Sequence, residues 1–266
     1  MTQANNYGIF EFMKYSFFVL RIAILFEVTS SVALATCPVP SQISQVDRTQ
    51  FSQKVQTEAI RKAIQIRQII AQYPTQCPIA DHYSASILQR LISSSHLSAT
   101  AYPGIDVVTT MGCFTRDYNM EIDSAHIQMV QLWLRNARSE EEYAFPLAHE
   151  LAHFILGHEE EQINYRFTHS GYGLDWFPMR IREETDADQY GMQLLANAGY
   201  NASAAPDALK HVFNLDGTGL GGGDSEHGSN KDRFLRLKNQ NLQCSYPKEP
   251  SISVDSKSKK ELSGLN

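Results

Sequence analysis

Residues 147–158 constrain the fold more than any other part of this 266-residue chain. They place His149, Glu150 and His153 in the spacing H-E-x-x-H among mostly apolar residues. Residues four apart lie on one face of a helix, so both imidazoles can face one metal ion. Glu150 is then close enough to take a proton from a water molecule at that ion. The pattern predicts a buried zinc-binding helix, and the alternative is a core helix whose histidines are only hydrogen-bonded.

A second helix is the candidate source of the third protein ligand that a catalytic zinc ion usually has. Residues 180–198 have helical spacing and precede Gly199, a typical capping glycine. Glu184 and Asp188 share one face of this helix, and a buried carboxylate is costly unless it binds a metal or pairs with a charge. We therefore expect Glu184 to be a ligand and Asp188 to hold the second nitrogen of a ligand histidine. Glu183 is the competing ligand, and a solvent-facing acidic helix start is the alternative.

These two segments resemble the HtpX-type and CAAX prenyl endopeptidase family of zinc metallopeptidases, which pairs H-E-x-x-H with a downstream E-x-x-x-D. Residues 184–188 match the second motif, and residues 191–201 resemble the family's run into an Ala-Gly-Tyr turn. His227 and Arg233 resemble its His-Pro-x(4)-Arg segment, although Gly228 stands where proline is usual.

The resemblance covers about residues 84–240 and leaves residues 36–83 unexplained. It implies one Zn2+ per chain with three ligands: His149, His153 and Glu184. It makes Glu150 the catalytic base, and His227 either stabilises the oxyanion or closes the zinc site in a latent state. Arg233 would pair with a carboxylate and orient the loop that carries His227.

The predicted fold class is α+β. We expect a mainly helical zincin-type core with a small β-sheet edge, in which the H-E-x-x-H helix packs against the helix of the glutamate ligand. The chain is predicted to divide into four parts: a signal peptide (1–35), an N-terminal helical region (36–83), a zinc metallopeptidase domain (84–246) and a disordered tail (247–266).

Periodicity predicts the individual elements. The expected helices are 55–73, 84–94 and 125–137, and the expected strands are 105–109 and 119–123. Ser139 and Glu142 form a capping-box start for the motif helix. Residues 159–179 are predicted to form a loop or flap, whose aromatic residues either line a substrate groove or pack an irregular segment.

The N-terminal residues predict export. Residues 15–35 are largely apolar and end in the small-x-small pattern that signal peptidase cleaves. Met13 is a better start than Met1 for a signal peptide of ordinary length. Two charged residues interrupt the apolar run, which disfavours a permanent transmembrane helix. The protein is expected in the periplasm or secreted, with lipoprotein anchoring through Cys37 as the weaker alternative.

The remaining composition bears on partners and cross-links. The net charge is −6, and the only basic cluster lies in the tail, so nucleic acid is not an expected partner. No later segment is apolar enough to span a bilayer, so the mature chain is expected to have no integral membrane span. In an exported protein, an even number of cysteines indicates two disulfides, with the pairing left open among Cys37, Cys77, Cys113 and Cys244.

The function expected from these features is zinc-dependent endopeptidase activity on protein or peptide substrates in cell-envelope protein quality control. One alternative is a chaperone-like or latent zinc-binding domain closed by His227, and another is a secreted protease that acts on foreign proteins. His158, His169 and His211 have no partner at ligand spacing, so we expect them to be structural or exposed. The oligomeric state is left open.

Overall fold

The computed structural model describes residues 46–72, 78–94, 100–102, 105–112, 121–123, 125–212 and 223–241. The helices after a 3-10 turn at Arg48–Gln50 are α2 (Gln53–Gln72), α3 (Pro78–Ser94), α4 (Gln131–Asn136), α5 (Glu140–Leu156), α6 (His158–Thr168), α7 (Trp176–Asn197), α8 (Ala204–Val212) and α9 (Asn230–Asn241). The strands are β1 (Thr100–Tyr102), β2 (Ile105–Asp106), β3 (Val108–Gly112), β4 (Glu121–Asp123), β5 (His126–Val130), β6 (Gly223–Asp224) and β7 (Gly228–Ser229).

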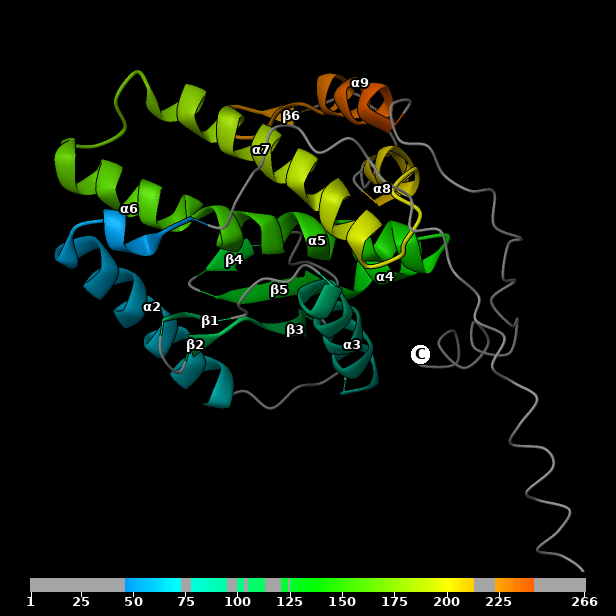
Figure 1. Cartoon of the computed structure of the whole chain (residues 1–266), viewed down its shortest axis with the longest axis horizontal. Helices are drawn as coiled ribbons and strands as arrows, with labels where there is room; N and C mark the ends of the chain where they lie inside the picture. The colour runs from blue at the N-terminus through cyan, green and yellow to red at the C-terminus, as the bar shows by residue number, and fades with distance from the viewer. Residues whose placement is uncertain are drawn as a thin grey trace, which may run out of the picture. The chain divides into compact units, whose positions relative to one another are not determined.

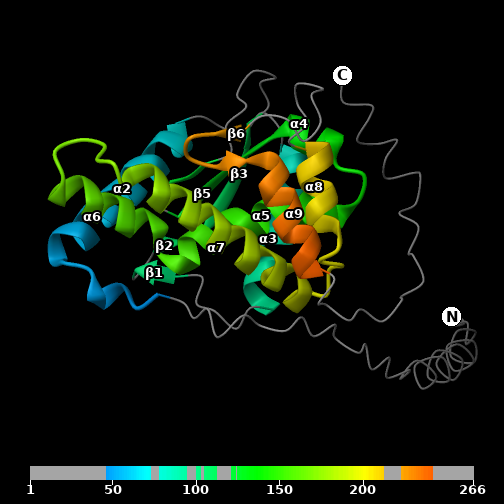
Figure 2. The same cartoon turned by 90° about the horizontal axis from the view of Figure 1, so that it is seen from above.

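Helix α5, which carries the H-E-x-x-H motif, lies between α7 and the β3–β5–β4 sheet (Figure 1). Figure 2 shows from above that α7 runs across α5. Every side chain of α5 from Glu142 to Ile155 is buried, because helices α3, α7 and α8 and the sheet all pack against it. The predicted fold class is confirmed: the protein is α+β and mainly helical, with a small sheet, and the motif helix packs against the glutamate helix.

Both ends of α5 are fixed by local hydrogen bonds. Ser139 Oγ accepts a bond from the Glu142 amide at 3.2 Å, and the Glu142 carboxylate accepts one from the Arg138 amide at 2.9 Å, so Ser139 caps the helix as predicted. At the other end, Gly157 has φ +73°, the left-handed conformation that favours glycine. A Cβ atom there would also stand 2.6 Å from Val46 Cγ1. The chain can therefore turn from α5 directly into α6.

The segment before α2 contacts this turn. Val46 N–H donates to the Ile155 carbonyl at 3.0 Å. The buried Arg48 guanidinium donates to the Phe154 carbonyl and, at 2.8 Å, to Glu160. Residues from the region 36–83 thus bind carbonyls at the C-terminal end of the motif helix, where cations are favoured by the helix dipole.

The sheet corrects one sequence prediction. Residues 125–137 were expected to be one helix, but they form strand β5 followed by the short helix α4. Ala125 has φ +70°, which prevents a helix from starting there. Ile127 and Met129, two residues apart, are fully buried, as a strand with one face on the core requires. Strand β5 is central, parallel to β3 and antiparallel to the edge strand β4.

Residues 159–179 also differ from the prediction. Most of them belong to α6 and to the start of α7, and only residues 169–175 connect the two helices. Helix α6 forms because Ile163 is buried against Val55 and Ala59 of α2. The aromatic residues divide into two sets. Tyr165 and Trp176 are buried with ring centroids 5.3 Å apart, whereas Phe167, Tyr172 and Phe177 are exposed.

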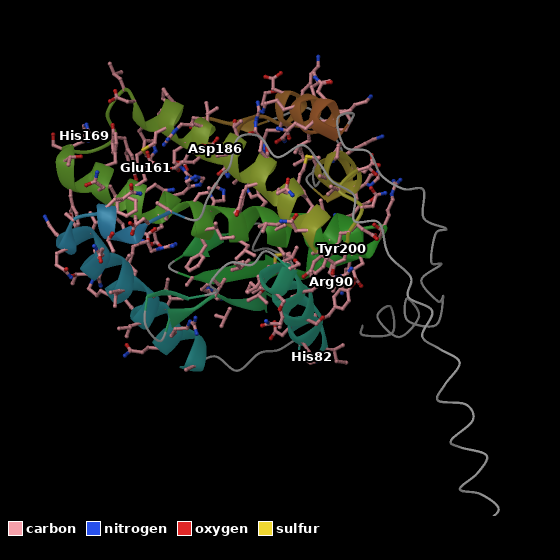
Figure 3. All side chains as sticks on the ribbon, in the orientation of Figure 1. His82, Arg90, Glu161, His169, Asp186 and Tyr200 are labelled. Atoms are coloured by element: carbon pink, nitrogen blue, oxygen red, sulfur yellow. The ribbon has the colours of Figure 1, made fainter. Side chains whose placement is uncertain are left out.

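The C-terminal end of α7 matches the prediction for residues 180–198, with an earlier start at Trp176. Gly199 has φ +74°, as expected of a capping glycine. Arg90 of α3 holds this end, because its Nε donates to the Ala198 carbonyl at 2.9 Å and its guanidinium stacks 4.0 Å from the Tyr200 ring centroid (Figure 3).

Several predictions concern residues outside the described part of the chain. These are the signal peptide (1–35), the tail (247–266) and all four cysteines, so the two disulfides stay a prediction. Helix α3 begins at Pro78, six residues before the predicted start of the metallopeptidase domain, and the domain division also stays a prediction. Within the described ranges, no helix combines the length and the hydropathy that crossing a bilayer requires.

Candidate metal centre

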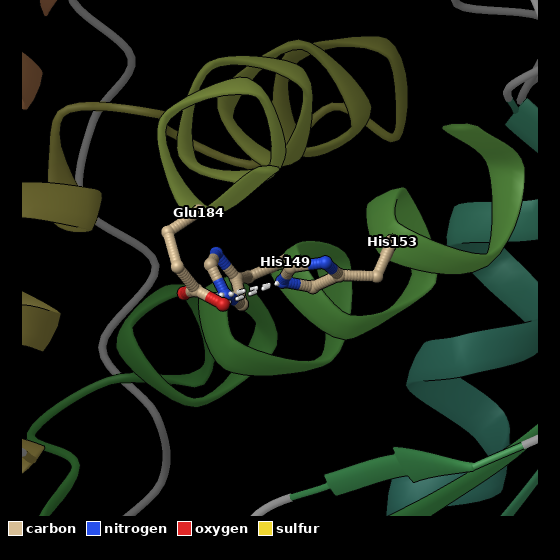
Figure 4. A group of neighbouring side chains, drawn as sticks. All are labelled: His149, His153 and Glu184. Carbon is tan, nitrogen blue, oxygen red and sulfur yellow. Dashed lines mark hydrogen bonds and ion pairs between the residues drawn. The ribbon is translucent and has the colours of Figure 1, made fainter. Parts of the chain in front are cut away.

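Three buried side chains meet between α5 and α7 (Figure 4). Glu184 reaches from α7 to the two imidazoles of α5, and the three side chains form a group that could hold a metal ion. His149 Nε2 and His153 Nε2 are 3.1 Å apart. The Glu184 carboxylate oxygens lie 3.2 Å from His149 Nε2 and 3.3 Å from His153 Nε2. The structure therefore brings together the three residues expected to be ligands.

The Nδ1 atom of His149 faces a buried ion pair. It lies 3.1 Å from Asp188 Oδ1, and the Asp188 carboxylate accepts two bonds from Arg233, at 2.9 Å and 2.7 Å. Burial alone would raise the pKa of Asp188, but Arg233 and His149 hold it at about 2. Burial alone would lower the pKa of His149, but Asp188 and Glu184 raise it to about 10. Asp188 thus lies beside His149, the kind of position expected for it, and Arg233 pairs with the Asp188 carboxylate.

His153 has a different neighbour, His158, at the start of α6. Their Nδ1 atoms are 2.7 Å apart, and both rings are buried. Burial, together with the nearby His153, lowers the pKa of His158 to about 2, so this imidazole is neutral and can accept a hydrogen bond. The sequence predicted a structural or exposed position for His158, and it did not predict the contact with His153. The sequence feature that could have predicted this contact is Gly157. A glycine that ends α5 lets the chain turn sharply, so that His158 lies beside His153.

The geometry fits a tetrahedral zinc ion. With bonds of 2.0–2.1 Å, ligand atoms around tetrahedral zinc are about 3.3–3.4 Å apart, close to the 3.1, 3.2 and 3.3 Å measured between the three side chains. When the two Nδ1 atoms carry the protons, both Nε2 lone pairs point at one position, which a cation satisfies. Glu184 Oε2 is also buried without a hydrogen bond, as an oxygen that binds a metal would be.

The two neighbouring glutamates take different places. Glu150 follows His149 in the sequence of α5 and is buried. Glu183, the competing ligand, points toward α6: its carboxylate accepts bonds from Arg180 at 2.6 Å and Gln162 at 2.9 Å. Burial raises the pKa of Glu183 to about 7, although Arg180 and Gln162 oppose that shift. The group of described residues that could hold a metal ion accordingly contains Glu184 and not Glu183.

His227 lies in the turn between β6 and β7, and its Nε2 is 4.0 Å from Glu184 Oε1. The partner of Arg233 is a carboxylate, as the resemblance implied. A contact of Arg180 also joins the His227 turn to α7. Arg180 Nε lies 3.4 Å from Glu226, and its Nη2 lies 3.5 Å from Glu184. No sequence motif singled out Arg180, because its contact with Glu226 joins residues that are 46 positions apart.

The other two histidines are away from this group. His169 is exposed at the end of α6 and stacks on Tyr165 with a centroid separation of 4.0 Å (Figure 3). His211 on α8 lies 3.1 Å from Glu142 at the start of α5. Both therefore have contacts of the structural or surface kind that the sequence predicted.

Comparison with known proteins gives a partial match. No family model matches the chain. The chain is 30% identical over 128 residues to the mitochondrial metalloendopeptidase OMA1 of Arabidopsis thaliana, a similarity that covers 41% of this chain and 26% of that protein. The chain thus spans about a quarter of the length of this relative. Together with the buried His-His-Glu group, this distant similarity supports a zinc metallopeptidase family.

Proposed function

We propose that the protein is a zinc-dependent endopeptidase that hydrolyses protein or peptide substrates. The observation that carries the proposal is the convergence of His149, His153 and Glu184 at about the separations of a tetrahedral zinc site. The buried Glu150 follows His149 directly on α5. The similarity to a metalloendopeptidase supports the same activity. We further propose that the chain is exported and acts in cell-envelope protein quality control, because its N-terminal residues have the pattern of a signal peptide.

In this mechanism, His149, His153 and Glu184 hold one Zn2+. When bound, the ion polarises the scissile carbonyl and lowers the pKa of a water molecule. Glu150 accepts the proton of that water and delivers it to the leaving amine. His227 donates a hydrogen bond to the oxyanion that develops on the carbonyl. Asp188 and Arg233 keep the His149 ring in place, and His158 does the same for His153.

The donor set favours catalysis over a structural role. Structural zinc sites are closed by four protein ligands, whereas catalytic sites have three and leave one position open. The described residues supply three candidate ligands in one group, and Glu150 stands in the sequence between the two histidines.

A latent zinc-binding domain is the second candidate. His227 Nε2 lies only 4.0 Å from Glu184 Oε1, so a small shift of the turn between β6 and β7 would let it take the fourth position. In that state His227 closes the site, and the domain acts as a chaperone or scaffold until the turn moves.

Replacing the base tests the proposed mechanism. Glu150→Gln should reduce cleavage of an unfolded protein such as casein by about a hundredfold or more, because the proton acceptor is lost while the zinc ligands remain. Zinc content should stay at one ion per chain. The matched control is Glu141→Gln on the same helix, which should cleave like the unmodified chain, and a chelator should abolish both activities. Cleavage that survives Glu150→Gln would overturn the mechanism.

Replacing His227 separates the two candidates. His227→Ala should slow cleavage if this side chain stabilises the oxyanion, with a loss of about ten- to a thousandfold in kcat. Faster cleavage by His227→Ala than by the unmodified chain would instead support the latent domain.

A further inference from the structure

We propose that substrate recognition depends on an exposed apolar ridge that leads to the metal centre, and that the ridge binds large apolar side chains of an extended polypeptide. We define the ridge by four residues of the α6–α7 connection and of α7: Tyr172, Leu174, Phe177 and Ile181. The inference deepens the proposed peptidase function and rests on it for the identity of the bound chain.

All four side chains are exposed although they are large and apolar. Leu174 is 95% and Tyr172 73% exposed, and Phe177 and Ile181 are exposed by about two fifths (42% and 38%). The Tyr172 ring contacts the buried Trp176 with centroids 4.9 Å apart, whereas no ring contact is found for the exposed Phe177 among the described residues. Clustered exposed apolar side chains are characteristic of binding surfaces.

The ridge shares a face of α7 with the metal centre. Phe177, Ile181 and Glu184 stand at positions i, i+4 and i+7, which lie on one side of a helix. The side chain that faces α6 lies on a different side: the Glu183 carboxylate accepts a bond from Gln162 there. Arg180 shares the side of the ridge and lies 3.5 Å from Glu184. The ridge therefore continues the line of Glu184 toward the N-terminal end of α7.

Contacts across the β6–β7 turn connect Ile181 to the ligands. A Cβ atom built on Gly228 would lie 3.8 Å from Ile181 Cγ1, and the preceding residue, His227, is 4.0 Å from Glu184. Ile181 is thus separated from the metal centre by the width of this turn. A chain whose scissile bond lies at the metal centre would pass this turn to reach the ridge.

The spacing sets which substrate positions are affected. A helix rises about 1.5 Å per residue, so Ile181 and Phe177 stand about 4.5 Å and 10 Å from Glu184 along α7. An extended chain advances about 3.3 Å per residue. The ridge should therefore contact substrate side chains about one to three residues from the scissile bond. The ridge lies next to the metal centre, as the binding surface for a substrate polypeptide must. A surface that binds lipid would not need to lie there.

The test compares two fluorogenic peptides of ten residues. One carries Leu and Phe within three residues of the scissile bond on both sides, and the other carries Ser and Asn there. The unmodified chain should prefer the apolar peptide by about tenfold in kcat/KM, because partial burial of two large side chains corresponds to roughly that factor.

The double variant Phe177→Ser and Ile181→Ser should reduce this ratio to near one, and Leu174→Ser, a change at an almost fully exposed position, should reduce it partly. The control Ile79→Ser, also exposed at 59% but on α3, should leave the ratio unchanged.

Binding is measured separately on the Glu150→Gln background by fluorescence anisotropy, with the same peptides and with phosphatidylethanolamine–phosphatidylglycerol vesicles. Binding of the apolar peptide that is lost in the double variant supports the inference. If that binding is found but neither peptide is cleaved, the proposed peptidase activity is wrong and the binding role of the ridge is kept. Cleavage with no apolar preference, or with a preference that the double variant keeps, overturns the inference and leaves the peptidase proposal intact. Vesicle binding that is lost in the double variant, with peptide binding unchanged, also overturns it.

Discussion

Each ligand histidine has a different partner for its second nitrogen. His149 faces the carboxylate of Asp188, which is held by Arg233, whereas His153 faces the neutral imidazole of His158. A metal-bound imidazole usually donates its other N–H to an acceptor that fixes the ring and its tautomer. Because His158 is buried and neutral, it can be that acceptor for His153.

The role of His158 gives a prediction at the residue scale. His158→Ala should weaken zinc binding by about ten- to a hundredfold, because the buried Nδ1–H of His153 loses its acceptor. His158→Asn should restore most of the affinity, since an amide oxygen can accept the same bond. Competition with a chromogenic zinc chelator measures the affinities. The control is His169→Ala, at the residue that follows α6, and equal affinities for His158→Ala and this control would contradict the role.

Motif spacing identified the residues of the site that lie on regular helices. The pair His149 and His153 followed from one helix face, and Glu184 with Asp188 followed from another. His158 and Arg180 were missed for a physical reason. His158 is brought back by the left-handed turn at Gly157, and Arg180 acts through contacts with Glu226 in a distant turn. Neither relation has a fixed spacing in sequence.

At the scale of elements, the site depends on how closely α7 approaches α5. Gly191 makes the approach possible: a Cβ atom there would lie 3.1 Å from the backbone nitrogen of His149 and 3.2 Å from its Cα. These are backbone atoms of the motif helix, so they cannot rotate away as a side chain can. One added methyl group must push apart the helices that carry the histidine and glutamate ligands.

This contact predicts separate effects for two glycines of the same region. Gly191→Ala should destabilise the protein by about 1–3 kcal/mol through overpacking and should also weaken zinc binding. Gly199→Ala should cost about 1 kcal/mol because φ is positive there, but it should leave zinc affinity unchanged. Urea unfolding and zinc titration of both variants measure the two effects. Unchanged zinc affinity in Gly191→Ala would show that the helix spacing does not set the ligand geometry.

Element predictions failed where two patterns overlap. Residues 125–137 contain apolar positions that fit both a helix and a strand. The positive φ of Ala125 and the pairing with β3 favour a strand, and β5 forms. Residues 159–179 were read as a loop because they are polar, but α6 needs few apolar residues when Ile163 alone inserts against α2. Helices with strong periodicity and clear caps, α5 and α7 above all, were predicted correctly.

At the scale of the whole molecule, buried and partly buried tyrosines join helices that are distant in sequence. Tyr143 of α5 and Ser84 of α3 share a hydrogen bond of 2.6 Å in the core. The hydroxyls of Tyr83 and Tyr200 both donate to Glu140, at 3.2 Å and 3.0 Å. Burial raises the pKa of each of these three tyrosines above its ordinary value. Their ionisation therefore opposes the folded state.

This linkage predicts a loss of stability in alkali. Because the folded chain holds the Tyr143 proton more tightly, the stabilisation is complete below the unfolded pKa of about 10 and is lost as the pH rises above it, by about 1.4 kcal/mol per pH unit. Tyr143→Phe should be about 1 kcal/mol less stable at pH 8, because the bond to Ser84 is lost, yet as stable as the unmodified chain near pH 11. Ser84→Ala removes the same bond but keeps the phenol, so its unfolding free energy should fall as steeply as that of the unmodified chain. Urea unfolding between pH 8 and 11 with saturating zinc measures all three proteins, and parallel curves for Tyr143→Phe and Ser84→Ala would contradict the linkage.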